Sequence, residues 1–493
     1  MPILPPLPAL AAGHGRAVLM GADGTLAPVK PGNVAKQLGG QKALVVHGPA
    51  TLNRLGNPVI ELLDILELFA FVCPAQSLAP TPAGVARALE LEVPGSLEEA
   101  AASLAEMAEI LLARLAAGKD TPLNRDAAGL AARMGSQGWG WAPYVLAALG
   151  QPAARPDGMA MRLWKRLPKW EETAPRPPPS SFPVTPAQAR ARLATLLGEG
   201  AEQRPAQADY ASAATEAFAP RALEDHPHAV IAEAGTGTGK TMGYLAPASI
   251  WAEQNKGAVW ISTFTRHLQR QIEQEARRLP SGTKIVLRKG RENYLCLLNF
   301  EDAASVDRYA VPLGLIARWA MVSADGDLFG GDLPGWFAEL FGNALLSSIA
   351  DRRGECIHAA CPHFSVCVIE RVIRNAREAE LVIANHALVM AQAVWGGLDD
   401  DYVPTRYVFD EGHHIFDAAD SAFSVELSGS AMAELRRWLL GAEGARSRAR
   451  GLAKRLEDVI AGDQRAIDLV QVVREGAKSL PAPMFSMRLD PEL

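Results

Sequence analysis

Short apolar runs alternate with turn-forming residues along the chain, a pattern typical of the strands and helices of an α/β protein. Apolar runs that predict strands lie at 16–20, 42–47, 229–232, 257–263, 380–386 and 406–409. Segments that predict helices lie at 58–71, 96–117, 186–197, 242–246, 432–440 and 452–460. The predicted fold class is therefore α/β, with a helical region after residue 416.

A proline-rich stretch divides the chain. Residues 173–186 contain six prolines, which exclude helices and central strands and make the stretch a semi-rigid spacer. The whole chain of 493 residues is too long for one hydrophobic core. We expect an α/β domain over 1–165, a linker over 166–190, a second α/β domain over 191–415 and a helical segment over 416–493.

Composition narrows the class of protein. A hydrophobic content of 48% and a charged content of 21% are those of a globular protein in water. The net charge of −6 gives no global basic field, so a nucleic-acid surface would be a local groove. The longest apolar stretch, 59–72, is broken by acidic residues, and the N-terminus lacks the basic start of a signal peptide. We expect a cytoplasmic protein without a membrane segment.

A glycine-rich stretch, AGTGTGKT, lies between a predicted strand and a predicted helix. Its glycines let the backbone curl so that successive N–H groups point at phosphate oxygens, and the helix N-terminus adds a positive dipole end. Lys240 supplies a cation for the phosphates, and the Thr241 hydroxyl suits a Mg²⁺ ligand. A chance turn is the alternative, which this context disfavours. The expected phosphate-binding residues are Ala234, Gly235, Thr236, Gly237, Thr238, Gly239, Lys240 and Thr241.

Polar residues follow the predicted strands at 257–263, 380–386 and 406–409, where ligands bind at the edge of open α/β sheets. Two adjacent acids follow the last strand, and hydroxyl groups with a helix start follow the first, which suits a phosphodiester backbone. A threonine there is alternatively only a helix cap. The residues are Thr263, Thr265, Arg266, Asn385, His386, Asp410 and Glu411.

Four of the five cysteines fall in one region: Cys296, Cys356, Cys361 and Cys367, with Cys73 elsewhere. In a reducing compartment such a cluster favours metal binding over disulfides. Four thiolates can form either a zinc site or a [4Fe–4S] cluster, and their spacing alone does not separate the two. Beside Cys296, Lys289 and Arg291 suit phosphate groups, and Tyr294 suits stacking on a base.

These motifs, taken in order, resemble the XPD/DinG family of superfamily 2 DNA helicases. The resemblance runs from about Arg204 to Asp417 and rests on KGRENYLC, the cysteine triplet, AELVIANHALV and VFDEGHH. It implies a RecA-like motor domain over 191–415, with an insertion at 290–370 whose four cysteines hold a [4Fe–4S] cluster, and then the start of a helical arch. It also implies ATP and Mg²⁺ as cofactors and DNA as the partner.

The same resemblance implies roles for single residues. Asp410 resembles the Mg²⁺ partner, Glu411 the residue that polarises the attacking water, and His413 a link between this site and bound DNA. The sequence has DEGH where many relatives have DEAH. Gln207, three residues after Arg204, resembles the Q-motif glutamine that hydrogen-bonds adenine; an exposed loop glutamine is the alternative.

Residues 15–150 resemble DnaQ-like exonuclease domains, an RNase H-like fold that holds two metal ions on several carboxylates. Here the position of the expected Asp-x-Glu pair reads Asp23-Gly24-Thr25, and Gly48 follows His47 where asparagine is expected. Asp64 remains, but alone it is more typical of a solvated or capping residue. We interpret this region as a degenerate, non-catalytic exonuclease-like domain, or as an α/β interaction domain.

The predicted function is that of a DinG-type helicase, which couples ATP hydrolysis to movement along and unwinding of single-stranded or forked DNA. Two alternatives are an ATP- and DNA-binding module without motor activity and a P-loop phosphotransferase, to which the cysteines would contribute nothing. The family's second motor domain would lie beyond Leu493, so we expect either a truncated product or a helicase half that another chain completes.

Overall fold

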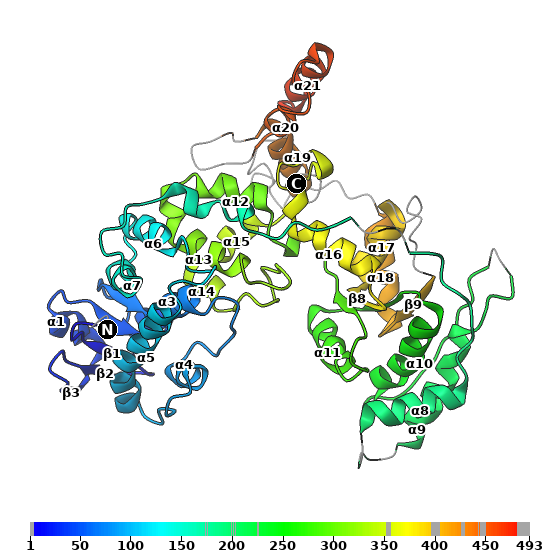
Figure 1. The fold of residues 1–493 in the computed structure, drawn as a ribbon, viewed down its shortest axis with the longest axis horizontal. Helices are drawn as coiled ribbons and strands as arrows, with labels where there is room; N and C mark the ends of the chain where they lie inside the picture. Colours follow the sequence, from blue (N-terminus) through cyan, green and yellow to red (C-terminus); the bar gives the residue numbers. More distant parts are fainter. Residues whose placement is uncertain are drawn as a thin grey trace, which may run out of the picture. The chain divides into compact units, whose positions relative to one another are not determined.

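The computed structural model describes residues 4–172, 174, 176–198, 200, 202, 204–223, 226–351, 356–395, 405–424, 429–441, 443 and 450–480. They divide into two compact units (Figure 1). The first unit takes its described residues from 1–169, 291–369 and 436–479. The second unit takes them from 170–290, 370–435 and 480–493. The segment 291–369, expected within the second α/β domain, therefore belongs to the same unit as the N-terminal region.

The first unit contains a mixed five-stranded sheet in the order β3-β2-β1-β4-β5. The pairs β1–β4 and β4–β5 are parallel, and the pairs β1–β2 and β2–β3 are antiparallel. The strands are β1 (Ala9–Ala12), β2 (Ala17–Met20), β3 (Leu26–Val29), β4 (Ala43–Val45) and β5 (Leu62–Asp64). The strands predicted at 16–20 and 42–47 are confirmed.

Helices of the first unit cover this sheet and extend away from it. They are α1 (Val34–Leu38), α2 (Gly48–Arg54), α3 (Ile65–Val72), α4 (Pro82–Leu89), α5 (Leu97–Ala117), α6 (Ala127–Ser136), α7 (Ala142–Ala148), α12 (Leu297–Ala304), α13 (Ala310–Ala320), α14 (Phe337–Phe341) and α15 (Asn343–Ile349). The helix predicted at 96–117 is confirmed, and the Ser96 hydroxyl caps it by accepting from the Glu99 amide at 3.1 Å.

The helix predicted over 58–71 is wrong in its first half. Residues 62–64 instead form β5, which pairs with β4. Asp64 then starts α3, because its carboxylate accepts the Leu66 amide at 3.0 Å and so caps the helix. An apolar run next to a sheet edge can satisfy its backbone groups by pairing, which its helical spacing does not reveal.

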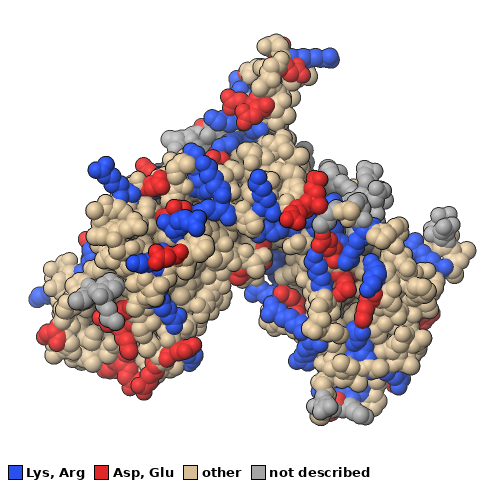
Figure 2. All heavy atoms as spheres, in the orientation of Figure 1, with Lys and Arg blue, Asp and Glu red and all other residues tan. Residues whose placement is uncertain are grey.

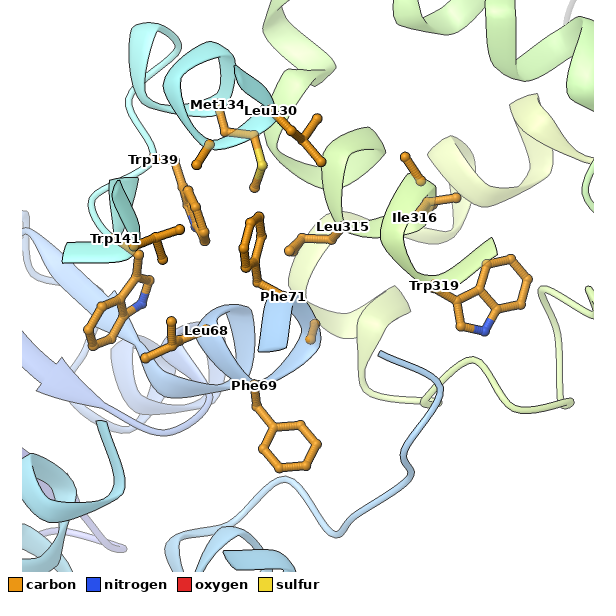
Figure 3. Close-up of a cluster of buried hydrophobic side chains, with 14 of the residues drawn as sticks. Leu68, Phe69, Phe71, Leu130, Met134, Trp139, Trp141, Leu315, Ile316 and Trp319 are labelled. Atoms are coloured by element: carbon orange, nitrogen blue, oxygen red, sulfur yellow. The ribbon is translucent and has the colours of Figure 1, made fainter. Parts of the chain in front are cut away.

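One hydrophobic core joins the N-terminal region to the segment 291–369 (Figure 3). Phe71 of α3 and Trp139 lie with ring centroids 5.1 Å apart, and Leu315 and Trp319 of α13 belong to the same core. Figure 3 shows side chains from α3, α6 and α13 converging on this cluster. These two parts of the chain therefore fold as one body rather than as a domain and a separate insertion.

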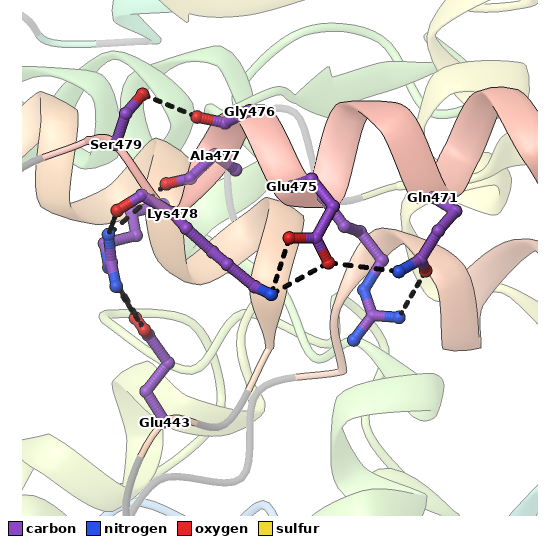
Figure 4. Close-up of polar contacts among 9 residues, drawn as sticks. Glu443, Gln471, Glu475, Gly476, Ala477, Lys478 and Ser479 are labelled. Carbon is purple, nitrogen blue, oxygen red and sulfur yellow. Dashed lines mark hydrogen bonds and ion pairs between the residues drawn. The ribbon is translucent and has the colours of Figure 1, made fainter.

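Helices α19 (Gly429–Leu440), α20 (Leu452–Leu456) and α21 (Gln464–Ala477) confirm the predicted helical character after residue 416, as far as the described residues reach. Figure 4 shows the end of α21, where the Lys478 ammonium donates to both carboxylate oxygens of Glu475, at 2.8 and 2.7 Å. Arg436 of α19 contacts the carbonyl oxygen of Lys478 at 2.6 Å, which ties the first of these helices to the last.

The second unit contains a parallel four-stranded sheet in the order β7-β8-β6-β9. The strands are β6 (Val259–Thr263), β7 (Ile285–Leu287), β8 (Leu381–Asn385) and β9 (Arg406–Phe409). The strands predicted at 257–263, 380–386 and 406–409 are confirmed. In the register, Ser262 pairs with Phe409 and Thr263 with Asn385, so the carboxyl ends of β6, β8 and β9 lie together.

Both faces of this sheet are covered. Val259 and Ile261 of β6 pack into a core with α8, α10 and α11, while Trp260 between them packs into a second core with α16 and α17. This alternation produces three layers, and the predicted α/β class is confirmed. The helices are α8 (Pro186–Leu197), α9 (Pro205–Ala214), α10 (Lys240–Asn255), α11 (Arg266–Ala276), α16 (Val368–Arg377), α17 (His386–Trp395) and α18 (Ile415–Phe423).

The strand predicted at 229–232 is absent, although its residues are described. Residues 227–235 contain no helix or strand, and the Ile231 side chain is 97% exposed. A short apolar run favours an extended backbone, but a strand exists only where a neighbour supplies hydrogen bonds. The phosphate loop therefore does not follow a strand here, whereas the predicted helix after it is confirmed as α10.

The surface carries mixed charge. On the face drawn in Figure 2, basic and acidic side chains are interspersed over both units, in keeping with the net charge of −6. None of the helices in the described part of the chain has the length and apolar character needed to cross a membrane.

Candidate functional site

The glycine-rich loop turns sharply before α10. Gly237 and Gly239 have φ angles of 78° and 77°, in the left-handed region that favours glycine. At Gly239 a β-carbon would also lie 2.1 Å from the amide nitrogen of Gln207, so a larger residue there would have to displace the end of that side chain. Helix α10 begins at Lys240, so its unpaired N-terminal amide groups border the loop, as anion binding requires.

Side chains at the start of α9 donate hydrogen bonds to backbone carbonyl oxygens of this loop. The Gln207 side-chain amide donates to the Gly239 carbonyl oxygen at 2.8 Å, and the Arg204 guanidinium donates to the Gly237 carbonyl oxygen at 2.9 Å. Gln207 is 4% exposed, so it is not the free loop glutamine that was the alternative. Its contact with adenine stays a prediction. The contact of Arg204 was not predicted, although its place in the Arg-x-x-Gln motif was a signal.

The two acids follow β9 directly, next to β6. The Asp410 amide donates to the Ser262 carbonyl oxygen at 2.8 Å, which continues the β6–β9 ladder. The Thr263 hydroxyl donates to the Asp410 carboxylate at 3.2 Å. Burial raises the pKa of Asp410, and the charge of Glu411 acts in the same direction, while Thr263 and Lys240 oppose it.

The structure brings the four predicted catalytic side chains together. The Lys240 ammonium lies 3.4 Å from one carboxylate oxygen of Glu411, and the His413 imidazole lies 3.6 Å from the other. Glu411 has a φ of 53°, a left-handed conformation that is uncommon outside glycine. A cation, two carboxylates and an imidazole thus meet at the mouth of the loop.

The strand ends carry contacts that the sequence did not indicate. The Ser262 hydroxyl lies 2.7 Å from Nδ1 of His386, which is 1% exposed, and burial lowers the pKa of this imidazole. The Phe264 ring stacks on His414, with centroids 3.8 Å apart. Asn385 accepts the Leu388 amide at 2.9 Å and so caps α17.

The residues predicted to contact DNA differ in their surroundings. Thr265 caps α11 by accepting the Leu268 amide at 3.2 Å, and Arg266 next to it is exposed. Thr263, His386, Lys289 and Tyr294 are buried. Thr263, Thr265, Arg266, Lys289, Asn385 and His386 belong to the second unit, and Arg291 and Tyr294 to the first. Arg266 is thus the predicted cation best exposed to meet a DNA backbone.

Arg291 is engaged within the first unit. Its guanidinium donates to the Asp351 carboxylate at 2.7 Å and to the Cys356 sulfur at 2.8 Å. Burial of Arg291 opposes its charged form, but Asp351 and the cysteine charges outweigh this and raise its pKa. The guanidinium therefore faces the cysteine region rather than solvent.

The four clustered cysteines all belong to the first unit. Burial raises the pKa of the Cys296 thiol to about 12, and the charges of Asp351 and Cys367 act in the same direction. Burial also raises the pKa of Cys361, with Cys356 adding to it. Within the described ranges, no three His, Cys, Asp or Glu side chains are grouped so that they could hold a metal ion. The donor chemistry fits a thiolate-bound group, while the sulfur atoms are not gathered into one coordination sphere.

The N-terminal acids do not converge. Asp64 is buried, and its carboxylate accepts the backbone amides of His47, Gly48 and Leu66. Asp23 lies in the exposed turn between β2 and β3, where it accepts the Thr25 amide at 3.0 Å. His47 is paired at 2.7 Å with Glu339 of α14. Asp64 and Asp23 thus each make local backbone contacts, and the degenerate exonuclease-like interpretation stays a prediction.

Comparison with known proteins agrees with this site. A DEAD/DEAH box helicase model matches residues 212–297. The chain is 31% identical to an ATP-dependent helicase DinG of Mycobacterium tuberculosis over 264 residues, which is 47% of this chain and 37% of the relative. It is 31% identical to the ATP-dependent DNA helicase YoaA of Escherichia coli over 230 residues, 42% of this chain and 33% of the relative.

A third relative, named 3'-5' exonuclease DinG in Bacillus subtilis, is 30% identical over 234 residues, 45% of this chain and 24% of the relative. The matched region therefore spans between about a quarter and about two fifths of the length of these curated relatives.

Proposed function

Since the chain belongs to the DinG-like family of helicases, we propose that its second unit binds Mg²⁺-ATP and hydrolyses it to drive movement on single-stranded DNA. One observation carries the proposal: the Lys240 ammonium and the Glu411 carboxylate lie 3.4 Å apart, at the start of α10 and beside a loop of left-handed glycines. A cation suited to bind phosphates and a carboxylate suited to polarise water thus both lie at the opening of the phosphate loop.

Each residue has a proposed task. The loop amides and Lys240 bind the phosphate oxygens, and the Thr241 hydroxyl and Asp410 hold Mg²⁺. Burial raises the pKa of Asp410, which a bound divalent cation would reverse by favouring the carboxylate. Glu411 polarises the attacking water after the Lys240 ammonium has moved from the Glu411 carboxylate to the phosphates. Gln207 positions Gly239 through its hydrogen bond to the Gly239 carbonyl oxygen. If this bond opened, the Gln207 amide could contact the adenine edge.

The DNA would lie at the carboxyl ends of β6, β8 and β9. Thr265 and the exposed Arg266 at the start of α11 suit phosphate oxygens, and so does the helix N-terminus itself. Binding of this kind is independent of sequence and weakens with salt, because it rests on displaced counterions. Single-stranded and forked DNA are the proposed substrates.

We also propose that Cys296, Cys356, Cys361 and Cys367 hold a [4Fe–4S] cluster, whose thiolate ligands would be favoured by the neighbouring Arg291. Protein purified without oxygen should then contain about four iron atoms per chain, and Cys361→Ser should remove them. One zinc ion and no iron would replace this proposal with a structural zinc site.

For the N-terminal region we propose a supporting role and no nuclease activity. Arg318 of α13 is 1% exposed, and its guanidinium donates to the carbonyl oxygens of Phe71 and Leu123 and to the Asn124 amide oxygen at 2.7 Å. Arg133 of α6 donates to the Ala304 carbonyl oxygen at 3.0 Å. These contacts and the shared core fix the cysteine-bearing segment on the N-terminal region.

The test of the proposed function is ATP hydrolysis by purified protein, measured with and without oligothymidylate. We expect hydrolysis that needs Lys240 and Glu411 and rises with DNA. A protein that binds ATP and DNA but does not hydrolyse ATP would be a binding module without motor activity. Transfer of phosphate to an acceptor other than water would instead identify a phosphotransferase.

A further inference from the structure

Phe264 and His414 form an aromatic stack where two neighbouring strands end. Their ring centroids lie 3.8 Å apart and their planes are inclined by 13°. Phe264 follows β6 directly and is 45% exposed, so the sheet's core does not require its ring. His414 lies in the 3-10 helix Gly412–His414, which follows Glu411 directly. The stack therefore joins the end of β6 to the turn that carries the proposed water-polarising carboxylate.

The stack is the last of three contacts made by consecutive residues of β6 and its extension. Strand β6 lies between β8 and β9, and each of these residues contacts the segment that follows one of its neighbours. The pairs are Ser262 with His386, Thr263 with Asp410, and Phe264 with His414. Of these residues, Ser262, Thr263 and His386 are fully buried, whereas Phe264 is partly exposed. A displacement of the backbone after β6 would therefore be transmitted through these contacts to the residues after β9.

The proposed DNA contacts begin one residue further on. Thr265 caps α11 and Arg266 starts that helix, with its side chain exposed. A DNA phosphate bound at this helix start would lie next to the backbone of Phe264. The residue that senses DNA and the residue that stacks on His414 thus share one short, extended segment.

The other end of the link is held in an uncommon conformation. Glu411 has a φ of 53° and ψ of 49°, and its carboxylate is paired with Lys240 and His413. Binding of Mg²⁺-ATP would draw Lys240 to the phosphates and remove one of these restraints. The turn from Glu411 to His414 is then free to relax, and its movement reaches Phe264 through the stack.

We infer that the Phe264–His414 stack couples the nucleotide site to the DNA-binding face, with both rings acting as positioning residues. This inference rests on the proposed binding of nucleotide and DNA to the second unit. By linkage, the stack must then change the affinity for nucleotide when DNA is bound, and the affinity for DNA by the same factor when nucleotide is bound.

The test measures this factor with the full chain. The affinity for a non-hydrolysable ATP analogue with Mg²⁺ is titrated without and with saturating oligothymidylate. The wild-type protein should show a change of about fivefold or more, the lower end of usual coupling between sites. Phe264→Ala and His414→Ala should reduce the factor to about one, with nucleotide affinity in the absence of DNA unchanged. His414→Phe keeps a stacked ring and should retain the factor.

A matched control is Phe416→Ala, which removes a 72% exposed aromatic ring on α18, two residues beyond His414. It should leave the factor at the wild-type value. If Phe264→Ala weakens DNA binding equally with and without nucleotide, the ring is a simple DNA contact and the coupling role is refuted. A wild-type factor of one would also refute it, while leaving both binding activities in place. Absence of nucleotide binding altogether would refute the proposed function as well.

Discussion

Lys240 and Glu411 neutralise each other across the mouth of the phosphate loop, with Nζ and Oε1 3.4 Å apart. Their side chains are 27% and 35% exposed, so the pair contributes little to stability, about 0–1 kcal/mol. Its importance is functional, because the cation that would bind phosphates and the carboxylate that would activate water are each other's partner in this structure. Nucleotide must therefore compete with Glu411 for Lys240.

Lys240→Ala should weaken Mg²⁺-ATP binding by more than tenfold, at least about 1.4 kcal/mol, because it removes the cation that faces the phosphates. Glu411→Gln should bind ATP about as tightly as the wild type or more tightly, since it frees Lys240, but should not hydrolyse it. Titration calorimetry checks both affinities. Lys256→Ala, at the other end of α10, is the control and should change neither. Equal affinity for wild type and Lys240→Ala would refute the site.

Gly239→Ala should weaken nucleotide binding and destabilise the second unit. A β-carbon there would lie 2.1 Å from the Gln207 amide nitrogen, and its left-handed φ of 77° costs a non-glycine residue about 1–2 kcal/mol. Gly235→Ala is the matched control in the same loop, since a β-carbon there meets nothing within 4 Å.

Urea unfolding and nucleotide titration of both variants check this. Adding Gln207→Ala to Gly239→Ala should relieve the overlap but leave the backbone strain, so recovery should be partial. If Gly239→Ala binds nucleotide as well as Gly235→Ala does, the loop has a different conformation in solution.

The sequence predicted the phosphate loop and the acids after β9 because their requirements are local. Left-handed glycines, a helix start and a strand followed by two acids are visible in a few residues. The prediction of a strand at 229–232 was wrong because a strand also needs a neighbouring strand to pair with, which its own residues do not specify. Similarly, the stack of Phe264 on His414 depends on the register between β6 and β9.

The sequence also did not predict that residues 291–369 join the N-terminal region in the first unit. Arg318 looked like any helix residue, yet it is buried against carbonyl oxygens of residues far from it along the chain, and burial lowers its pKa to about 9. The core that joins α3 to α13 likewise forms between segments more than two hundred residues apart. Patterns of period 2 or 3.6 show which face of an element is apolar, but not which distant element covers it.

Glu67 of α3 predicts a pH dependence of the first unit. Burial raises the pKa of this carboxyl to about 8, with the Asp64 charge acting in the same direction and the Trp139 hydrogen bond at 3.0 Å opposing it. Because the folded pKa lies above the unfolded value of 4.5, the stabilisation is complete below about pH 4.5 and is lost as the pH rises to about 8.

Glu67→Gln keeps an oxygen for the Trp139 indole and removes the titration. Relative to the wild type, it should therefore gain stability between pH 5 and pH 8, as measured by urea unfolding followed through tryptophan fluorescence. The control Glu109→Gln changes an exposed carboxylate of α5 and should show no such gain. A constant difference between wild type and Glu67→Gln across this pH range would show that Glu67 does not titrate there.

The two arginines predicted to bind DNA should behave differently. Arg266 is exposed at the start of α11, whereas Arg291 is bound to Asp351 at 2.7 Å and to the Cys356 sulfur at 2.8 Å. Arg266→Gln should therefore weaken binding of single-stranded DNA and reduce the salt slope by about one, since one phosphate contact is lost. Arg291→Gln should leave the slope unchanged and instead disturb the cysteine region, which thiol reactivity of the metal-free protein would reveal.

The measurement is fluorescence anisotropy of labelled oligothymidylate over a range of salt concentrations. Arg270→Gln, which removes another exposed arginine of α11 one turn further on, serves as the control for general charge effects. The opposite result, with Arg291 controlling the slope and Arg266 silent, would place the DNA on the first unit and not at the strand ends of the second.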